Sequence, residues 1–235
     1  MENNYPLNFI AQRYGVPENS RTPYQELQFL NVNVDFISTV VKLFDDAYPL
    51  SEGEFQKFSL NVIIDYIRKT HDFYLTKKLP EIEQSITLLL ADYEGNHPLL
   101  FLLKEFFISY QKDLRQHIET EEKQLLPYIE YLSCSHKGNI DMAEFFCRTK
   151  EFSVQKFIDD HSDVEGDLEK VRNLILLYDP PKSNQTPYRI LLTQLEFLEN
   201  DLRVHAIIED QVLLPKALLI ESKLERIFKK KIMEN

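Results

Sequence analysis

The sequence predicts an all-α protein, an antiparallel up-down four-helix bundle that follows a short N-terminal helical appendage. Hydrophobic residues make up 43% of the 235 residues and charged residues 28%, as in ordinary globular proteins. Only 5 residues are Gly, which argues against an all-β chain with many tight turns and against a Gly-rich nucleotide-binding design. Apolar residues recur at helical spacing in four long runs, and this pattern favours a bundle.

The four long helices are predicted over residues 54–93, 98–132, 141–177 and 186–219. Ser51 and Glu54 match a capping box at the start of the first helix. Pro98 suits an early position of the second helix, and Thr186 is expected to cap the fourth helix, with Pro187 at its first position. The breaks carry turn-forming residues: Glu94-Gly95-Asn96, Ser135 to Asn139, and Asp179 to Asn184.

Three regions follow from this reading. Residues 1–53 form the N-terminal helical appendage, which lacks cysteine and contains one shorter helix over Val34 to Phe44. Residues 54–219 form the bundle, and residues 220–235 form a C-terminal helical tail.

Charge and composition exclude several partners. With 27 Lys and Arg against 38 Asp and Glu, the net charge of −11 has the wrong sign for nucleic acid or an anionic membrane. No apolar stretch approaches the roughly 20 residues that span a bilayer. The first residues do not resemble a signal peptide, and the two cysteines, Cys134 and Cys147, cannot form a disulfide framework. We therefore expect a cytoplasmic protein without a nucleic-acid or membrane partner.

One motif occurs twice, with the pattern H-x3-E-x3-L-L-P. The first copy contains His117 and Glu121, and the second contains His205 and Glu209. Residues four apart lie on one face of a helix, so each copy presents an imidazole and a carboxylate as a chelating pair. A single such pair is commonly a surface coincidence, but the repetition with identical spacing favours a functional pair.

A further histidine precedes each copy at a similar interval. His71 lies 46 residues before His117, and His161 lies 44 residues before His205. If histidines on successive antiparallel helices share one level, each turn should fall midway between them. The midpoints are residues 94, 139 and 183, and each lies in a turn signal. The spacing therefore predicts four His and two Glu in one layer of the bundle core.

Such a set suits two metal ions, because imidazoles complete each coordination shell and each carboxylate can bridge two cations. Nitrogen and oxygen donors without thiolate suit iron, manganese or zinc. Iron is expected if an open position binds O2 or NO. The predicted metal ligands are His71, His117, Glu121, His161, His205 and Glu209. No catalytic residue is assigned.

Other residues near the motif have weaker signals. His97 and His136 fall outside the pattern and are expected at a helix start and in a loop. Pro127 and Pro215 should each kink or end a helix locally. Three carboxylates can orient ligand imidazoles, although a solvated helix face is the simpler expectation for them: Glu119, Glu122 and Asp160.

Over about residues 54–219 the sequence resembles the hemerythrin-like HHE cation-binding proteins, and within them the di-iron proteins that repair iron–sulfur clusters. In the repair proteins a four-helix bundle holds a non-haem di-iron centre through four His and two bridging Glu. The six residues above match those positions one for one. Oxygen-carrying hemerythrins instead use five His, one Glu and one Asp.

The resemblance implies two iron ions in an oxo- or hydroxo-bridged centre. It also implies a role in nitrosative and oxidative stress, through iron donation or handling of NO, O2 or peroxide, with damaged iron–sulfur proteins as partners. The repair proteins commonly carry an N-terminal cysteine pair, which residues 1–53 lack. Thiol chemistry therefore does not carry over to this chain.

Three alternatives stay open. The first is an O2 or NO binding, sensing or storage protein without repair activity. The second is an enzyme, an NO or peroxide reductase. The third is a metal-free interaction protein. The oligomeric state is also open, with a homodimer as one alternative.

Overall fold

The computed structural model describes residues 5–45, 47–48, 51–92, 98–137, 141–160, 166–177 and 185–233. Its regular structure is entirely helical, with no strand among these residues, as the sequence predicts. Within the same ranges, no helix combines the length and the apolar character that crossing a membrane requires.

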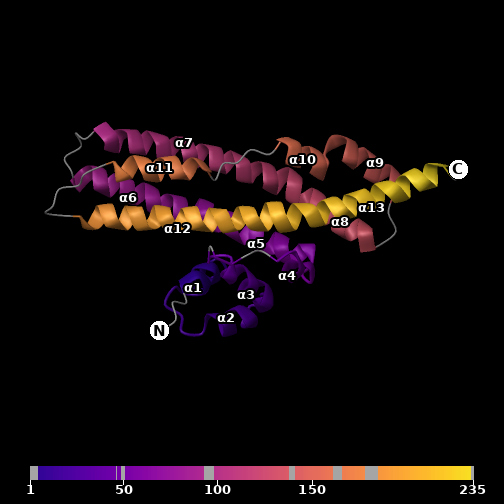
Figure 1. Cartoon of the computed structure of the whole chain (residues 1–235), viewed down its shortest axis with the longest axis horizontal. Helices are drawn as coiled ribbons and strands as arrows, with labels where there is room; N and C mark the ends of the chain where they lie inside the picture. The colour runs from indigo at the N-terminus through magenta and orange to yellow at the C-terminus, as the bar shows by residue number, and fades with distance from the viewer. Residues whose placement is uncertain are drawn as a thin grey trace. The chain divides into compact units, whose positions relative to one another are not determined.

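The α-helices, labelled in Figure 1, are α1 (Tyr5–Gln12), α2 (Pro23–Phe29), α3 (Val34–Lys42), α4 (Glu52–Gln56), α5 (Leu60–Phe73), α6 (Leu79–Asp92), α7 (Pro98–Thr120), α8 (Leu126–Lys137), α9 (Met142–Glu151), α10 (Val154–Asp160), α11 (Gly166–Leu176), α12 (Thr186–Ile208) and α13 (Leu214–Met233). Three π-helical turns join consecutive helices: η1 (Tyr74–Lys78), η2 (Glu121–Leu125) and η3 (Glu209–Leu213).

The chain divides into two compact units. The first comprises Met1–Lys69, Glu119–Ser162 and Ala206–Asn235, and the second comprises Thr70–Ile118 and Asp163–His205.

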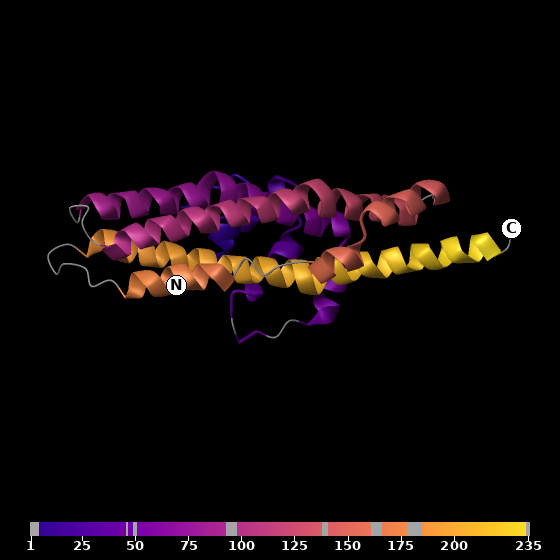
Figure 2. The ribbon, with the colours of Figure 1, turned by 90° about the horizontal axis from the view of Figure 1, so that it is seen from above.

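In the second unit, α6, α7, α11 and α12 run alongside one another (Figures 1 and 2). The Gln111 side-chain amide on α7 donates to the Leu79 carbonyl of α6 at 3.3 Å. An ion pair of 2.9 Å joins Arg172 on α11 to Glu199 on α12. These helices also bury apolar side chains. Examples are Leu103 and Phe107 of α7 and Leu191 and Leu198 of α12.

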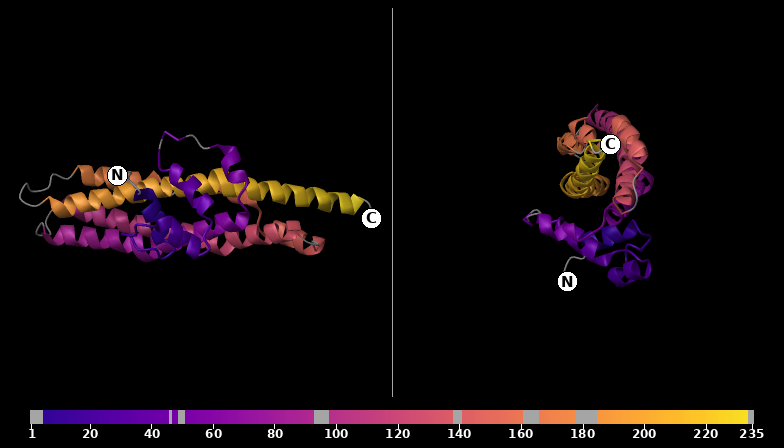
Figure 3. Two further views of the ribbon diagram at one scale, coloured as in Figure 1. Left: turned by 90° about the horizontal axis from the view of Figure 1, so that it is seen from below. Right: turned by 90° about the vertical axis from the view of Figure 1, so that its right-hand side faces the viewer.

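The N-terminal part of the first unit is a cluster of three short helices, α1, α2 and α3, which pack against one another (Figure 3). Helices α1 and α2 both end in Schellman motifs, where Gly15 (φ 83°) and Asn31 (φ 59°) adopt the left-handed conformation. Glycine has no Cβ to oppose this geometry, and Asn tolerates it better than most residues. The helix predicted from Val34 is confirmed as α3.

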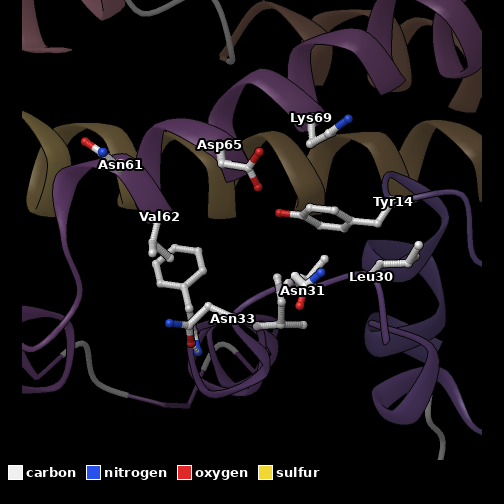
Figure 4. A pocket seen from close by; sticks show the side chains of 11 residues that line it. Tyr14, Leu30, Asn31, Asn33, Asn61, Val62, Asp65 and Lys69 are labelled. Atoms are coloured by element: carbon white, nitrogen blue, oxygen red, sulfur yellow. Dashed lines mark hydrogen bonds between the residues drawn. The ribbon is translucent and has the colours of Figure 1, made fainter. Parts of the chain in front are cut away.

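A cavity of about 450 Å3 lies in the first unit between α3, α5, the end of α1 and the turn after α2 (Figure 4). Tyr14 extends across it towards Asp65 of α5. Burial, and then the negative charge of Asp65, raise the pKa of the Tyr14 phenol, so this group stays neutral. Buried Phe36 and Ile37 supply apolar lining.

The first predicted helix is interrupted, because α4 ends at Gln56 and α5 begins at Leu60. Lys216 from α13 donates to the Phe55 and Phe58 carbonyls at 3.0 and 2.5 Å, which satisfies backbone acceptors at this break. Ser51 occupies the N-cap of α4 without a side-chain capping bond. The expected capping box does not form, because the Glu54 carboxylate instead accepts from the Tyr48 hydroxyl at 2.6 Å.

The third predicted helix is also interrupted. Helix α9 ends where Phe152 adopts an extended conformation, and α10 begins two residues later. The buried Glu221 carboxylate of α13 accepts from the Val154 backbone N–H at 3.1 Å and from the Tyr128 hydroxyl at 2.6 Å. A long-range side chain therefore caps α10.

The second and fourth predicted helices begin at Pro98 and Thr186 and continue without interruption through η2 and η3. The fourth helix thus includes Thr186, which was expected to cap it, as its first residue in place of Pro187. His136 lies in α8 rather than in a loop. The predicted turns at 94–96 and 179–184, and Gly138 and Asn139 of the third turn, lie outside the described residues.

Candidate metal centre

Each H-x3-E motif lies across the junction between an α-helix and a π-turn. His117 is in the last turn of α7, and Glu121 is the first residue of η2. In the second copy, His205 is in the last turn of α12, and Glu209 opens η3. His71 occupies the matching place near the end of α5, just before η1.

A Leu-Pro dipeptide follows each π-turn directly. A proline within an α-helix clashes with the carbonyl four residues earlier and donates no hydrogen bond. A π-turn widens the backbone at that point, so the helix continues instead of ending. Pro127 and Pro215 were expected to kink or end their helices, and the structure continues both helices through a π-turn. The three dipeptides are Leu79-Pro80, Leu126-Pro127 and Leu214-Pro215.

The structure gathers five of the six predicted ligands into two groups that can hold a metal ion. In one group, ligand atoms of His71, Glu121 and His205 lie within 4.8 Å of one another, and in the other those of His117, Glu121 and Glu209 do. Glu121 belongs to both groups, as a carboxylate that bridges two cations would. His161 lies outside the described residues.

Four of these five side chains are buried, and His117 is half-buried. Glu121 is 1% exposed and Glu209 is 2% exposed, while His71 and His205 are 2% and 3% exposed. A buried carboxylate is costly unless it is paired or binds a metal. Imidazole nitrogens and carboxylate oxygens fit iron, manganese or zinc, and Cys134 and Cys147 are exposed and belong to neither group. The donor set therefore fits the expected metal ions.

Ring contacts fix the position of His205. Its ring centroid lies 5.0 Å from that of His71, at an interplanar angle of 63°. The buried ring of Tyr74 lies 5.9 Å away in an edge-to-face arrangement. Neighbouring aromatic rings restrict the orientation of the imidazole, so its nitrogens point in fixed directions.

The three carboxylates considered for orienting the ligand imidazoles are either exposed to solvent or paired with a basic side chain. Glu119 is exposed beside Lys123, whose hydrogen bond and charge lower its pKa. Glu122 pairs with Arg68 at 3.4 Å. Asp160 is exposed at the end of α10. For Glu119 and Asp160 the simpler expectation of a solvated helix face is therefore correct.

A buried carboxylate close in sequence to the predicted ligands was not predicted. Asp201 is 0% exposed and lies one helical turn before His205. The signal in the sequence is a longer repeat, because D-L-R-x-H-x3-E occurs at both Asp113 and Asp201. The two positions differ in the structure, since Asp113 is exposed.

No protein-family model matches the chain. The chain is 23% identical over 158 residues to iron-sulfur cluster repair protein ScdA of Staphylococcus haemolyticus, which covers 66% of this chain and 65% of that protein. Over 187 residues it is 21% identical to ScdA of Staphylococcus epidermidis, covering 78% and 79%. Over 172 residues it is 25% identical to iron-sulfur cluster repair protein YtfE of Dickeya chrysanthemi, covering 72% and 71%.

The chain thus spans just under two thirds of the length of the Staphylococcus haemolyticus protein. These relatives, from two genera, are all named as iron-sulfur cluster repair proteins, and their similarity supports a relationship between this chain and that group of proteins.

Proposed function

We propose that this protein holds a non-haem di-iron centre in a hemerythrin-like four-helix bundle and acts in the repair of iron–sulfur clusters. The observation that carries the proposal is the pair of His and Glu groups, which share Glu121 and are buried except for the half-buried His117. The relatives named as iron-sulfur cluster repair proteins support the same assignment.

In this proposal, the bundle comprises residues 54–219, with residues 1–53 as an appendage and 220–235 as a tail. The six ligands are His71, His117, Glu121, His161, His205 and Glu209. Four imidazoles would complete the coordination of two irons, and the two carboxylates would bridge them. Bound iron would supply a site for a small ligand such as NO, O2 or peroxide.

The residues of this chain would then have distinct tasks. The buried carboxylates would neutralise the charge of the two cations. The rings of His71 and Tyr74 would hold the His205 imidazole in one orientation. Burial of the ligands would keep bulk water away from the centre. We place this activity in the cytoplasm, in the response to nitrosative and oxidative stress.

The first experiment measures metal content. After anaerobic reconstitution with Fe2+, we expect about two irons per chain in the wild type. His117→Ala and His205→Ala should lose iron, while His136→Ala, which alters a histidine outside the pattern, should retain both irons. Wild-type protein without bound iron would contradict the proposal.

The second experiment separates repair from binding and from turnover. Repair predicts that the iron-loaded protein restores the activity of aconitase damaged by NO, and that His205→Ala does not. NO-dependent changes in the iron spectrum without restored aconitase would favour a sensor or store. Sustained consumption of NO or peroxide with an electron donor would favour a reductase.

A further inference from the structure

Asp201 is a carboxylate whose burial requires an explanation. It is 0% exposed in the second unit, on the same helix as His205. Charged side chains are almost never fully buried unless they are paired with another group. We therefore expect the Asp201 carboxylate to interact with a neighbouring polar or charged group.

Helical geometry identifies that group. Asp201, His205 and Glu209 are spaced four residues apart, and all three are nearly inaccessible to solvent. Side chains of a helix lean towards its N-terminus, so the imidazole of a residue lies over the residue four positions earlier. This geometry places the His205 and Asp201 side chains on the same face of α12, one turn apart.

A histidine that binds a metal uses one ring nitrogen and leaves the other nitrogen protonated. That N–H usually donates to a carboxylate, a backbone carbonyl or water, which fixes the tautomer and raises the basicity of the ligand. One ring nitrogen of His205 lies in the group with His71 and Glu121. In a metal-bound His205 the other nitrogen would carry the proton that a carboxylate such as Asp201 accepts.

We propose that Asp201 is a positioning residue that accepts a hydrogen bond from His205 and so fixes this imidazole as a metal ligand. The inference rests on the proposed metal centre. It also gives the two copies of the repeat different roles, because Asp113 occupies the same repeat position but is exposed. We therefore do not expect the exposed Asp113 to affect metal binding.

The test compares wild type, Asp201→Asn and the matched control Asp113→Asn. Each protein is titrated anaerobically with Fe2+ and, in parallel, with Co2+, whose visible absorption reports the ligand geometry. We expect Asp201→Asn to weaken binding of one metal equivalent by about 10- to 100-fold and to shift the Co2+ absorption. Asp113→Asn should match wild type in both measurements.

A second measurement separates positioning from a merely structural role. The melting temperature of the metal-free Asp201→Asn variant should stay close to that of the metal-free wild type. Unchanged affinity would overturn the inference, as would weaker binding with an unchanged Co2+ spectrum and a lowered metal-free melting temperature. If the wild type itself binds neither metal, the proposed function fails, which is a different result from failure of Asp201 alone.

Discussion

Phe36 connects the N-terminal helices to the rest of the first unit. Its ring lies 5.1 Å from that of Phe58 and 5.5 Å from that of Tyr66 on α5, in edge-to-face arrangements. Arg13 of the N-terminal cluster donates to the Tyr66 hydroxyl at 2.7 Å. The N-terminal helices and α5 therefore share one core.

Phe36→Ala should lower the free energy of unfolding by about 3–5 kcal/mol, because it removes a buried ring and leaves a cavity. Phe29→Ala is the matched control, since Phe29 is 87% exposed and Phe36 is 1% exposed. Urea unfolding followed by circular dichroism measures both values. Equal stability of the two variants would contradict a shared core.

Glu221 predicts a pH dependence of stability. Burial raises its pKa above the ordinary value of 4.5, although hydrogen bonds from Tyr128 and Val154 oppose the shift. Between the unfolded and folded pKa values, the native state binds more protons than the unfolded state. The contribution of Glu221 is therefore fully present below about pH 4.5 and is lost as the pH rises through the folded pKa.

Glu221→Gln should remove this dependence, because the amide does not titrate. The free energy of unfolding of wild type relative to Glu221→Gln should fall as the pH rises above about 4.5. Urea titrations across that range measure it, with Glu151→Gln, which alters an exposed carboxylate at the end of α9, as the control. Parallel curves for wild type and Glu221→Gln would contradict the expectation.

At the scale of elements, the sequence predicts helices better than their interruptions. The starts at Pro98 and Val34 were predictable because local residues determine them. At the breaks at 57–59 and 152–153, backbone groups form hydrogen bonds with Lys216 and Glu221, which are distant in sequence. Period and capping signals contain no information about such partners.

The candidate site shows the same limit. The spacing of the proposed ligands was predictable because a repeat records it, and the structure groups five of those residues. The π-turns were not predicted, although each precedes a Leu-Pro dipeptide. A proline alone is also compatible with a kink or a helix end, and the packing on both sides of the turn decides between these outcomes.

A π-turn is equivalent to one extra residue in an α-helix, so deleting one residue should restore regular geometry. We expect deletion of exposed Gln211 from η3, combined with Pro215→Ala to avoid a proline clash, to preserve the packing of α12 and α13. The metal-free melting temperature should change by only a few degrees. Metal binding should weaken about tenfold or more, because the deletion shifts the Glu209 carboxylate relative to the His205 imidazole.

Two controls accompany this variant. Pro215→Ala alone should keep the π-turn, because the packed residues on both sides fix its register. Deletion of exposed Lys223 from α13 should rotate the following residues by about 100° and lower the melting temperature, because it disturbs buried Leu224. Unchanged metal affinity after the Gln211 deletion would show that η3 has no role in placing Glu209.

At the scale of the whole molecule, the two buried carboxylates proposed as ligands should oppose stability in the absence of a cation. The chain has a net charge of −11, and two of its carboxylates, Glu121 and Glu209, are buried away from water. A bound metal would reverse this effect, because it attracts the same carboxylates that otherwise repel one another. Folding and metal binding should therefore be coupled.

Thermal unfolding with and without Fe2+ tests this coupling. A ligand that binds only the native state at a free concentration 100-fold above its Kd adds about 2.7 kcal/mol for each site, so iron should raise the melting temperature and a chelator should reverse the rise. Glu209→Gln should affect the metal-free and the iron-bound protein differently. Its metal-free form should be at least as stable as metal-free wild type, because one buried charge is removed, but iron should stabilise it much less. If iron stabilises wild type and Glu209→Gln equally, Glu209 is not a ligand and its burial needs another explanation.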